Sequence, residues 1–534
     1  MPSETFLPRV NLGEDRLVDR LRFLGNHQRS EISSILQDVD RDLEHYSSEI
    51  YTLQAKLSFL ESQRERLRNH KAALSSLLSP IHRLPNELLA RILMLAGQES
   101  GLNSTNVDAL SVAAVCYRWR QMALASSSVW SSFHIYLPRE DEDNEKLDSL
   151  LEYRLDLFLE RSGQRPLDLS IQVADRDDEH PLFLNLTESS PRWENLSLDA
   201  YNDDYPSLQS ANLSSLKTVC IRVAEEWTEP LQLMWITSTK NLSTLSSNMG
   251  LPRNKEVNEP LRSFPVMHSV TKLTFCPEEP DFLEPLHRFP NIRYLGLQDL
   301  NMAEADIPAL SHVILPITSL DILFGPPVAV SPHLIELAMD ILTAPSLSSL
   351  MITSKPGMYT AEGQEILINS LSHIPSFLER SNCMLTQLVL KALPVTDQCV
   401  VDVLKHLHAL SELTVEDPIA ESDYDAPPYL GPISRELIES LHAHRRSSLR
   451  ISLSPIVPKL RSLVLKAQST GFDFSSFIST VASRWIPSTY ASMETGVACL
   501  RSVELHLVQE VDPEDYLPLA PFEASGLRVV VKGK

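Results

Sequence analysis

One short phrase, apolar-x-x-apolar-x-apolar, recurs through the last two thirds of the chain. Its two-residue step has the period of a β-strand and puts two apolar side chains on one side. Each copy therefore exposes an apolar face that only a neighbouring copy can cover, which predicts a stack of strands. Weaker copies lie near Leu242 and Leu334. The ten clear copies begin at Trp193, Leu216, Val270, Ile292, Leu310, Leu347, Leu385, Leu410, Leu460 and Leu500.

Helical stretches precede several copies, at residues 281–288, 365–380, 396–408 and 433–446. This alternation resembles the leucine-rich-repeat family, whose repeats have about 20–29 residues. The resemblance implies an α/β solenoid with its strands on the concave side, made irregular because the family's Asn or Cys ladder position is mostly missing. A helical-repeat solenoid of HEAT or armadillo type is the alternative, because apolar-x-x-apolar spacing also fits a helix surface.

Residues 32–78 carry a second pattern, in which apolar residues follow one another at alternating steps of four and three. The pattern predicts a helix about 70 Å long at 1.5 Å per residue, ended by Pro80. So narrow an apolar seam needs a second helix to cover it. That helix belongs either to a second copy of the chain, in a dimeric coiled coil, or to the same chain, near Leu17, Leu21 and Leu24 or in its main body. The seam consists of Ile32, Leu36, Val39, Leu43, Tyr46, Ile50, Leu53, Leu57, Leu60, Leu67, Leu74 and Leu78, interrupted by Arg64 and Lys71.

Between these two patterns lies a nearly neutral, helix-rich segment at residues 80–136. Leu84-Pro85-Asn86-Glu87 opens a helix, since proline suits the first turn and a carboxylate there meets the positive end of the helix dipole. A polar stretch at 97–106 follows, and then a second helical stretch at 107–125. Three short helices in about fifty residues bury too little surface to be stable alone, so a partner is expected to complete them.

Three elements in order, Leu84-Pro85-Asn86-Glu87-Leu88-Leu89, then Val115-Cys116-Tyr117-Arg118-Trp119-Arg120, then Val129-Trp130, resemble an F-box. In that family the partner is the SKP-type adaptor of cullin-based SCF ubiquitin ligases. The resemblance implies that the adaptor covers the first helix and the Trp-bearing helix. Transferred to this sequence, the residues in or directly behind that interface are Leu84, Pro85, Leu88, Leu89, Ile92, Leu93, Val115, Cys116 and Trp119.

The charge of the chain narrows the class of its other partners. Residues 1–136 hold 15 basic and 15 acidic residues, so the whole net charge of −23 lies in the remainder. Nucleic acid needs a basic stripe, which makes it an unexpected ligand for this acidic part, whereas a basic protein fits better. Without an apolar run of about 18 residues or a leader-like start, no membrane association is expected, and the chain should reside in cytoplasm or nucleus.

Catalytic and metal-binding signatures are missing from the sequence. Fifteen glycines form no phosphate-binding loop, and neither a GxSxG nor an HExxH motif occurs. The six cysteines are scattered without metal-ligand spacing, so we expect buried, reduced thiols. No enzyme activity, cofactor or metal is therefore predicted.

The sequence thus predicts an α+β multidomain protein with five parts. These are an N-terminal segment (1–31), a coiled-coil helix (32–79), an F-box (80–136), an acidic linker with a helix at 147–160 (137–165), and a leucine-rich-repeat-like domain (166–534) that opens with a strand at 167–173. Two polar stretches, 246–265 and 416–432, are either recognition loops or plain connections.

The expected function is that of a substrate-recognition subunit of an SCF-type ligase. Its partners would be the adaptor, through it a cullin, and an unknown target protein, with a homodimer through 32–78 as one option. The alternative hypothesis is a scaffold that uses its F-box and repeats outside any ligase. A hydrolase or transferase is the third hypothesis.

Overall fold

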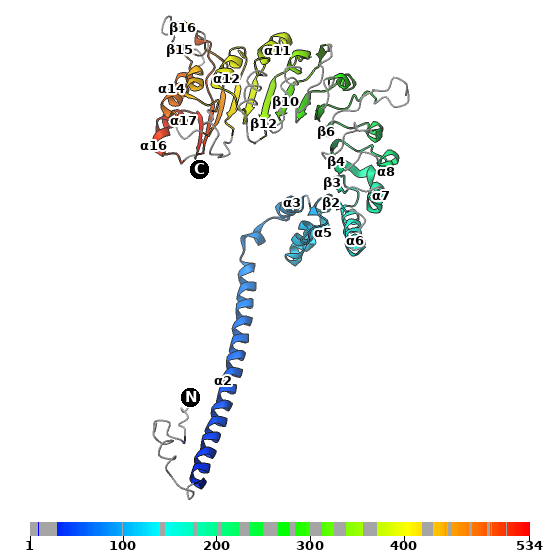
Figure 1. Ribbon diagram of the computed structural model, residues 1–534, viewed down its shortest axis with the longest axis vertical. Helices are drawn as coiled ribbons and strands as arrows, with labels where there is room; N and C mark the ends of the chain where they lie inside the picture. The colour runs from blue at the N-terminus through cyan, green and yellow to red at the C-terminus, as the bar shows by residue number, and fades with distance from the viewer. Residues whose placement is uncertain are drawn as a thin grey trace. The chain divides into compact units, whose positions relative to one another are not determined.

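Helices and strands alternate along most of the chain in an α+β architecture that begins with one long helix (Figure 1). The structure, a computed structural model, has two compact units, Met1–Leu89 and Ala90–Lys534. It describes residues 9, 29–98, 100–138, 145–174, 179–200, 205–223, 234–248, 265–277, 283–298, 312–324, 338–355, 371–418, 431–443, 445–446, 451–453, 455–468, 472–488, 492, 494–508 and 510–533.

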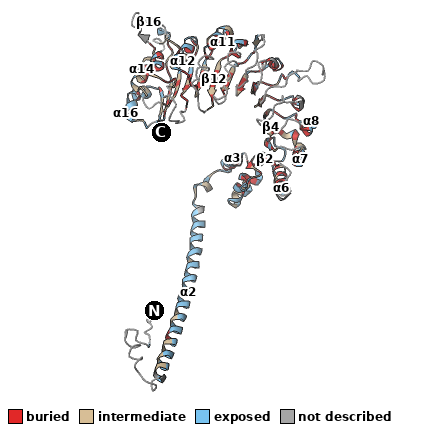
Figure 2. Ribbon diagram, in the orientation of Figure 1, coloured by how far each residue is buried: buried red, intermediate tan, exposed pale blue. Residues whose placement is uncertain are grey.

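The long helix α2 runs from Arg29 to Leu77. It contains no glycine or proline, and the short 3-10 helix η2 (Pro80–Arg83) follows it. The predicted N-terminal helix is therefore confirmed, whereas residues 10–28, including Leu17, Leu21 and Leu24, lie outside the described residues. Figure 2 shows α2 exposed over nearly its whole length. Its apolar seam is thus open along most of this unit.

The expected helical stretch at 107–125 is two helices, α4 (Asp108–Ala114) and α5 (Tyr117–Ala125). The chain breaks between them because Cys116 is extended, with φ −158° and ψ 171°. The other elements of this region are helix α3, strand β1 and 3-10 helix η3, at Asn86–Gly97, Ser100–Gly101 and Ser127–Val129.

One sheet of 15 strands dominates the second unit, with its strands in chain order. All neighbouring strands in it are parallel. After β1 they are β2 (Ser132–Leu137), β3 (Leu167–Val173), β4 (Trp193–Ala200), β5 (Thr218–Val223), β6 (Thr244–Ser247), β7 (Lys272–Phe275), β8 (Tyr294–Gln298), β10 (Ser319–Phe324), β12 (Ser349–Ser354), β13 (Gln387–Lys391), β14 (Glu412–Glu416), β17 (Ser462–Ala467), β18 (Ser502–Leu507) and β19 (Arg528–Lys532). Two further pairs stand apart, β9 (Val313–Ile314) with β11 (Leu342–Thr343), and β15 (Arg445–Arg446) with β16 (Ile451–Leu453).

Most copies of the recurring phrase lie on strands of this sheet, from β4 to β18. The prediction that the copy at Leu310 forms a strand of the stack is wrong, because its Val313 lies in β9, outside the main sheet. The sheet strand here is β10, where Ile317, Leu320 and Ile322 repeat the same spacing and are buried. The copy near Leu334 lies outside the described residues, as do 249–264 and 419–430 of the two candidate loops. An all-helical repeat is excluded by the sheet.

Helices line one side of the sheet (Figure 1). Along β13, Leu388 and Leu390 are buried, whereas Gln387, Val389 and Lys391 are partly exposed. Most other strands alternate in the same way, with β7, β8 and β19 as exceptions. The sheet thus has a covered face and an open face. Its helices are α6 (Glu145–Ser162), α7 (Pro181–Thr187), η5 (Ser190–Arg192), α8 (Pro206–Ser210), η6 (Met234–Ser238), η7 (Glu284–Arg288), α11 (Ile374–Ser381), α12 (Asp397–Leu404), α13 (Arg435–Ser440), α14 (Phe474–Arg484), α16 (Pro513–Tyr516), η9 (Leu517–Leu519) and α17 (Ala520–Ala524).

A row of hydroxyl groups joins many of these strands at their beginnings. The residue one position after the first apolar residue of the phrase is often Ser or Thr, and its hydroxyl donates to the carbonyl of its counterpart on the preceding strand. The six bonds measure 3.0–3.3 Å. We call this row the hydroxyl ladder, and its donors are Ser243, Thr271, Thr318, Ser348, Thr386 and Ser411.

The six cysteines are free thiols. All of them are of intermediate exposure, so the expectation that they are buried is wrong. Cys220, for example, lies on the open face of the sheet, between Ser197 of β4 and Ser246 of β6.

We predict that Arg484 is essential for the stability of the C-terminal part of the sheet. Its side chain is fully buried, and its guanidinium donates to the carbonyls of Leu441, Val457 and Ile456. Burial lowers its pKa to about 10, which still leaves it charged at neutral pH. The Arg484→Met variant leaves these carbonyls unpaired and should lose about 2–4 kcal/mol of unfolding free energy in urea denaturation. Arg435→Met, at an exposed arginine, is the control and should leave the transition unchanged; equal transitions for both variants would contradict the assignment.

We also predict a pH-dependent contribution from Asp417, just after β14. Burial raises the pKa of this carboxyl to about 6, although the N–H groups of Gln468 and Ile433 donate to it and act in the opposite direction. Because the folded state binds this proton more tightly than the unfolded chain, its stabilising effect is greatest below about pH 4 and is lost as the pH rises through about 6. The difference in unfolding free energy between wild type and Asp417→Asn should therefore change by about 2–3 kcal/mol over that range. Urea unfolding of both proteins at pH 4, 5, 6 and 7 measures it, and a constant difference would refute it.

Candidate functional site

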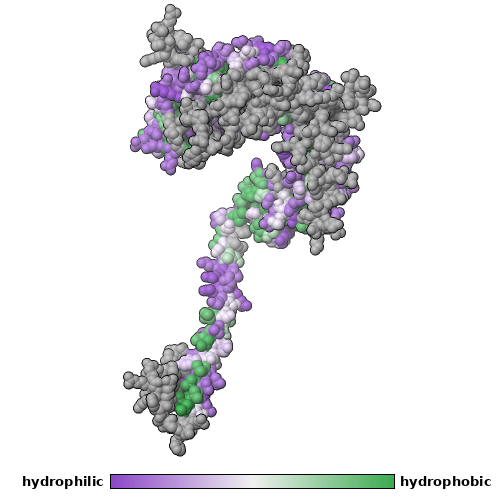
Figure 3. Space-filling view, viewed as in Figure 1, coloured by the Kyte–Doolittle hydropathy of each residue, from purple (hydrophilic) through white to green (hydrophobic). Residues whose placement is uncertain are grey.

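Helix α3 has one buried side and one exposed apolar side. Leu89 and Leu93 are completely buried, whereas Leu88, Ile92 and Leu95 are 52%, 41% and 57% exposed. Steps of four and three residues place these last three on one side of the helix. We call them the α3 stripe. Figure 3 shows the hydrophobic surface over this helix.

The beginning of α3 is shaped by Pro85. Its carbonyl accepts the N–H of Leu89 at 3.0 Å. Proline has no backbone N–H, but a helix needs none at this position because the N–H groups of the first turn have no partner within the helix. Pro85 is exposed and Leu84 is partly exposed.

The end of α3 is tied to the residues that follow it. A Cβ atom at Gly97 would lie 3.0 Å from Cγ1 and 3.3 Å from the carbonyl oxygen of Val129, so a larger residue here would require η3 to shift by a few tenths of an ångström. The Ser100 hydroxyl donates to the Gly97 carbonyl at 2.8 Å and accepts the Ala109 N–H at 3.1 Å. Ser100 therefore links the end of α3 to the first turn of α4.

Cys116 sets the turn between α4 and α5. Its Sγ accepts the Trp119 N–H at 3.5 Å and so caps α5, while Nε of Arg120 donates to the Ala113 carbonyl at 3.2 Å. This turn leaves the apolar side chain of Val115 62% exposed, and Tyr117 76% exposed.

Trp130 anchors the region to the sheet. It is buried, its Nε1–H donates to the Ala123 carbonyl at 2.8 Å, and its ring packs edge-on against Phe158 of α6 at 5.2 Å between centroids. Phe133 of β2 packs against the same ring at 5.5 Å. Strand β2 also pairs with β3, so the helices α4 and α5 are continuous with the large sheet, which sequence reasoning did not anticipate.

The nine residues expected at the interface fall into three groups by exposure. Four are exposed, three are partly exposed, and two are fully buried behind the surface. In that order they are Pro85, Leu88, Ile92 and Val115; Leu84, Cys116 and Trp119; and Leu89 and Leu93.

Among the large exposed apolar residues at 80–136 outside the nine, the two most exposed are Leu95 and Tyr117. Leu95 completes the step of three from Ile92, a periodicity that was available in the sequence. Tyr117 owes its exposure to the turn at Cys116, for which no local sequence signal exists.

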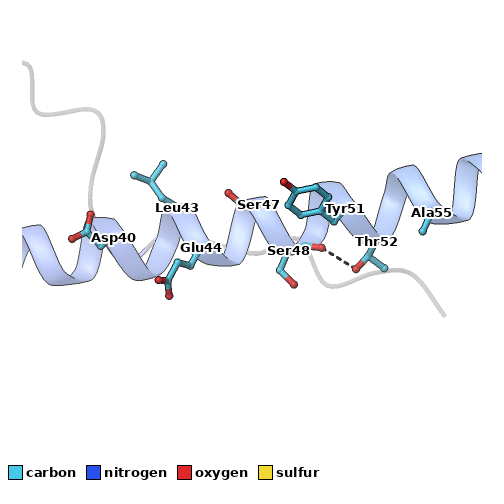
Figure 4. A pocket seen from close by; sticks show the side chains of 8 residues that line it. All are labelled: Asp40, Leu43, Glu44, Ser47, Ser48, Tyr51, Thr52 and Ala55. Atoms are coloured by element: carbon cyan, nitrogen blue, oxygen red, sulfur yellow. Dashed lines mark hydrogen bonds between the residues drawn. The ribbon is translucent and has the colours of Figure 1, made fainter.

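A shallow pocket lies along α2, and its eight lining residues all belong to this helix (Figure 4). Thr52 donates its hydroxyl to the Ser48 carbonyl within the helix at 2.9 Å. The other lining residues are Asp40, Leu43, Glu44, Ser47, Tyr51 and Ala55. A second pocket of about 470 Å³ lies near His406 and Glu379, whose side chains are 3.5 Å apart.

Across the described ranges, no group of three or more His, Cys, Asp or Glu side chains is placed to hold a metal ion. In the same part of the chain, no helix combines the length and the apolar character required to span a membrane.

The family model of the F-box-like domain matches residues 81–136. No curated protein matches the chain. The matched range contains α3, with its exposed stripe, the capped turn at Cys116, and Trp130. Residues 81–136 are therefore an F-box-like domain.

Proposed function

We propose that this chain is a substrate-recognition subunit of an SCF-type cullin ubiquitin ligase. F-box domains generally bind SKP-type adaptors, and the observation that carries the proposal here is the α3 stripe within the matched F-box range. The α3 stripe consists of three large apolar side chains, each about half exposed, on one side of a helix. Such a surface is typical of one that a partner covers.

The adaptor interface would centre on Leu88 and Ile92, with the buried Leu89 and Leu93 holding the helix from behind. Burying a leucine or isoleucine side chain completely stabilises by about 1.5–3 kcal/mol, so these residues have the size expected of hot spots. Val115, Tyr117 and the partly exposed Trp119 would add a second contact from the α4–α5 turn and the first turn of α5.

The strand-rich region would act as the target-binding domain, with the architecture of an irregular leucine-rich-repeat solenoid. Its support is the parallel sheet in chain order, the helices along one side and the hydroxyl ladder. On the open face, Met351, Val389 and Val464 lie in one register row, with Thr414 between the two valines.

A second row beside this one carries charges of both signs. Lys391, Glu416 and Lys466 are neighbours in it, and the last two form an ion pair of 2.8 Å. An apolar row flanked by mixed charge suits a protein surface better than a phosphate backbone.

The chain itself would not be an enzyme. It would hold a target at high effective concentration near the ubiquitin-transferring partner, in cytoplasm or nucleus. A scaffold that binds the adaptor without a cullin is the alternative, and the composition of the purified complex distinguishes the two.

We predict that Leu88→Asp abolishes adaptor binding without unfolding the chain. A charge in place of a half-exposed leucine prevents burial at the interface, so the affinity for adaptor should fall more than about 30-fold. Affinity purification with quantitative mass spectrometry measures adaptor and cullin, which should be lost together. Leu184→Asp, at a 46% exposed leucine on α7, is the matched control and should retain both. Unchanged recovery from Leu88→Asp would refute the interface, and adaptor without cullin in the wild type would favour the scaffold.

We further predict that Val389→Glu removes a target but not the adaptor. Val389 lies in the apolar row of the open face and is only partly exposed. A carboxylate there should therefore lower the affinity for a target protein about tenfold or more. The same purification should show a protein that is lost from Val389→Glu, retained by Leu88→Asp, and longer-lived in cells lacking the chain. Val266→Asp, at a 51% exposed valine outside the strands, serves as the control. Identical protein sets from Val389→Glu and wild type would contradict the assignment.

A further inference from the structure

Most of the apolar seam of α2 lies uncovered. The seam residues from Leu36 to Leu74 that are exposed are between 53% and 69% accessible. They extend over more than the three or four heptads that a stable coiled coil requires. These residues are Leu36, Leu43, Ile50, Leu53, Leu57, Leu60, Leu67 and Leu74.

The charges of α2 are divided between its two halves. Residues 29–53 hold two basic and six acidic residues, a net charge of −4, whereas residues 54–77 hold five basic and two acidic residues, a net charge of +3. Two copies side by side in parallel would place like halves together. An antiparallel pair places each acidic half beside a basic half, which electrostatics favours.

The two basic residues in the seam lead to the same orientation. In a parallel, in-register pair, Arg64 faces Arg64 of the second copy, and Lys71 faces Lys71. In an antiparallel pair centred on Ala55, Arg64 instead faces Tyr46 and Lys71 faces Val39. A parallel pair would gain contacts between Lys56 and Glu61 at its flanks, but it would hold two layers of like charge in its interior.

The antiparallel register also fits the apolar residues. The seam from Ile32 to Leu78 is symmetric about Ala55, so no part of it is left without an opposing seam. Leu43 then lies opposite Leu67 of the second copy, and Ile50 opposite Leu60. Full overlap along the helix follows from this one choice of centre.

At the flanks, this register places Asp40 beside Arg68 of the second copy, twice by symmetry. Figure 4 shows Leu43 projecting from one side of α2 and Glu44 and Ser48 from the other. The Arg68 side chain is 64% exposed and lies 3.7 Å from Glu65 of its own helix. Near the centre, Lys56 lies beside Lys56 of the second copy, but these long side chains can point away from each other into solvent. Asp42 already accepts the Arg9 N–H of its own chain at 2.7 Å, and the pairing does not require it.

We propose that α2 pairs with α2 of a second copy as an antiparallel coiled coil centred on Ala55. The two F-boxes of the dimer then begin at opposite ends of a rod about 70 Å long. This inference does not depend on adaptor binding, because α2 ends before residue 81, where the F-box match begins.

Photo-crosslinking of the full chain tests the orientation. A benzophenone amino acid replaces Leu36, and unlabelled chains are mixed with ¹⁵N-labelled chains so that crosslinks between copies are recognised by mass. The expected crosslinks join position 36 of one copy to the region of Leu74 of the other. Crosslinks between the two positions 36, crosslinks confined to one chain, or a monomer in light scattering would each overturn the proposal.

Charge reversal tests the register. Arg68→Glu should weaken dimerisation about tenfold, since two Asp40–Arg68 contacts become repulsive, and Asp40→Arg combined with Arg68→Glu should restore it to within about threefold. Arg66→Glu has the same charge change but lies outside the seam and its flanks, so it should change the dissociation constant less than about twofold. In a parallel dimer residues 40 and 68 lie about 40 Å apart, so no rescue would occur. Absence of rescue in analytical ultracentrifugation refutes the register, and adaptor recovery from the same variants tests the F-box separately.

Discussion

The structure depends on each strand covering the edge of the strand before it. Parallel strands such as β12, β13 and β14 pair residue for residue, which aligns their buried leucines in rows beneath the helices. A parallel connection requires a crossover, and the helices described between the strands lie on one side of the sheet (Figure 1). The other side of the sheet remains open, so this single pairing rule creates both the core and the surface proposed to bind a target.

The F-box-like region follows from the same constraint. Its three helices are too few to bury their own apolar residues, and part of the deficit is met by attachment to the sheet through Trp130, Phe133 and Phe158. The remaining deficit is the α3 stripe. The apolar side that the sheet does not cover is the side on which the family resemblance places the adaptor.

Much of this architecture could be predicted because strand period and helix period differ. The strands at β8 and β13 coincide with the recurring phrase, and α2 coincides with the heptad seam. The Leu310 copy failed because Ile317, Leu320 and Ile322 satisfy the same spacing a few residues later, and only pairing with β8 selects between them. The break at Cys116 was missed because apolar periodicity continues through it. Leu88 and Leu89 show the limit for the site: they are adjacent and chemically identical, yet one is half exposed and the other buried.

The hydroxyl ladder strengthens the middle of the sheet and is missing at both ends of it, where the corresponding residues are Glu194 and Lys217 on one side and Arg461 and Arg501 on the other. From Ser243 to Ser411, six strand beginnings carry a hydroxyl bond in addition to the backbone bond between the same two residues. On the next two strands the corresponding residues are Arg461 and Arg501, which have no hydroxyl. Their backbone N–H groups donate to carbonyls of the preceding strand at 2.8 and 2.7 Å. Since each rung reaches only one strand back, opening of β19 or β18 leaves the centre of the sheet intact. Fraying one strand at a time is therefore expected at the C-terminal edge, and amide protons of β18 and β19 should exchange with solvent sooner than those of the strands from β6 to β14.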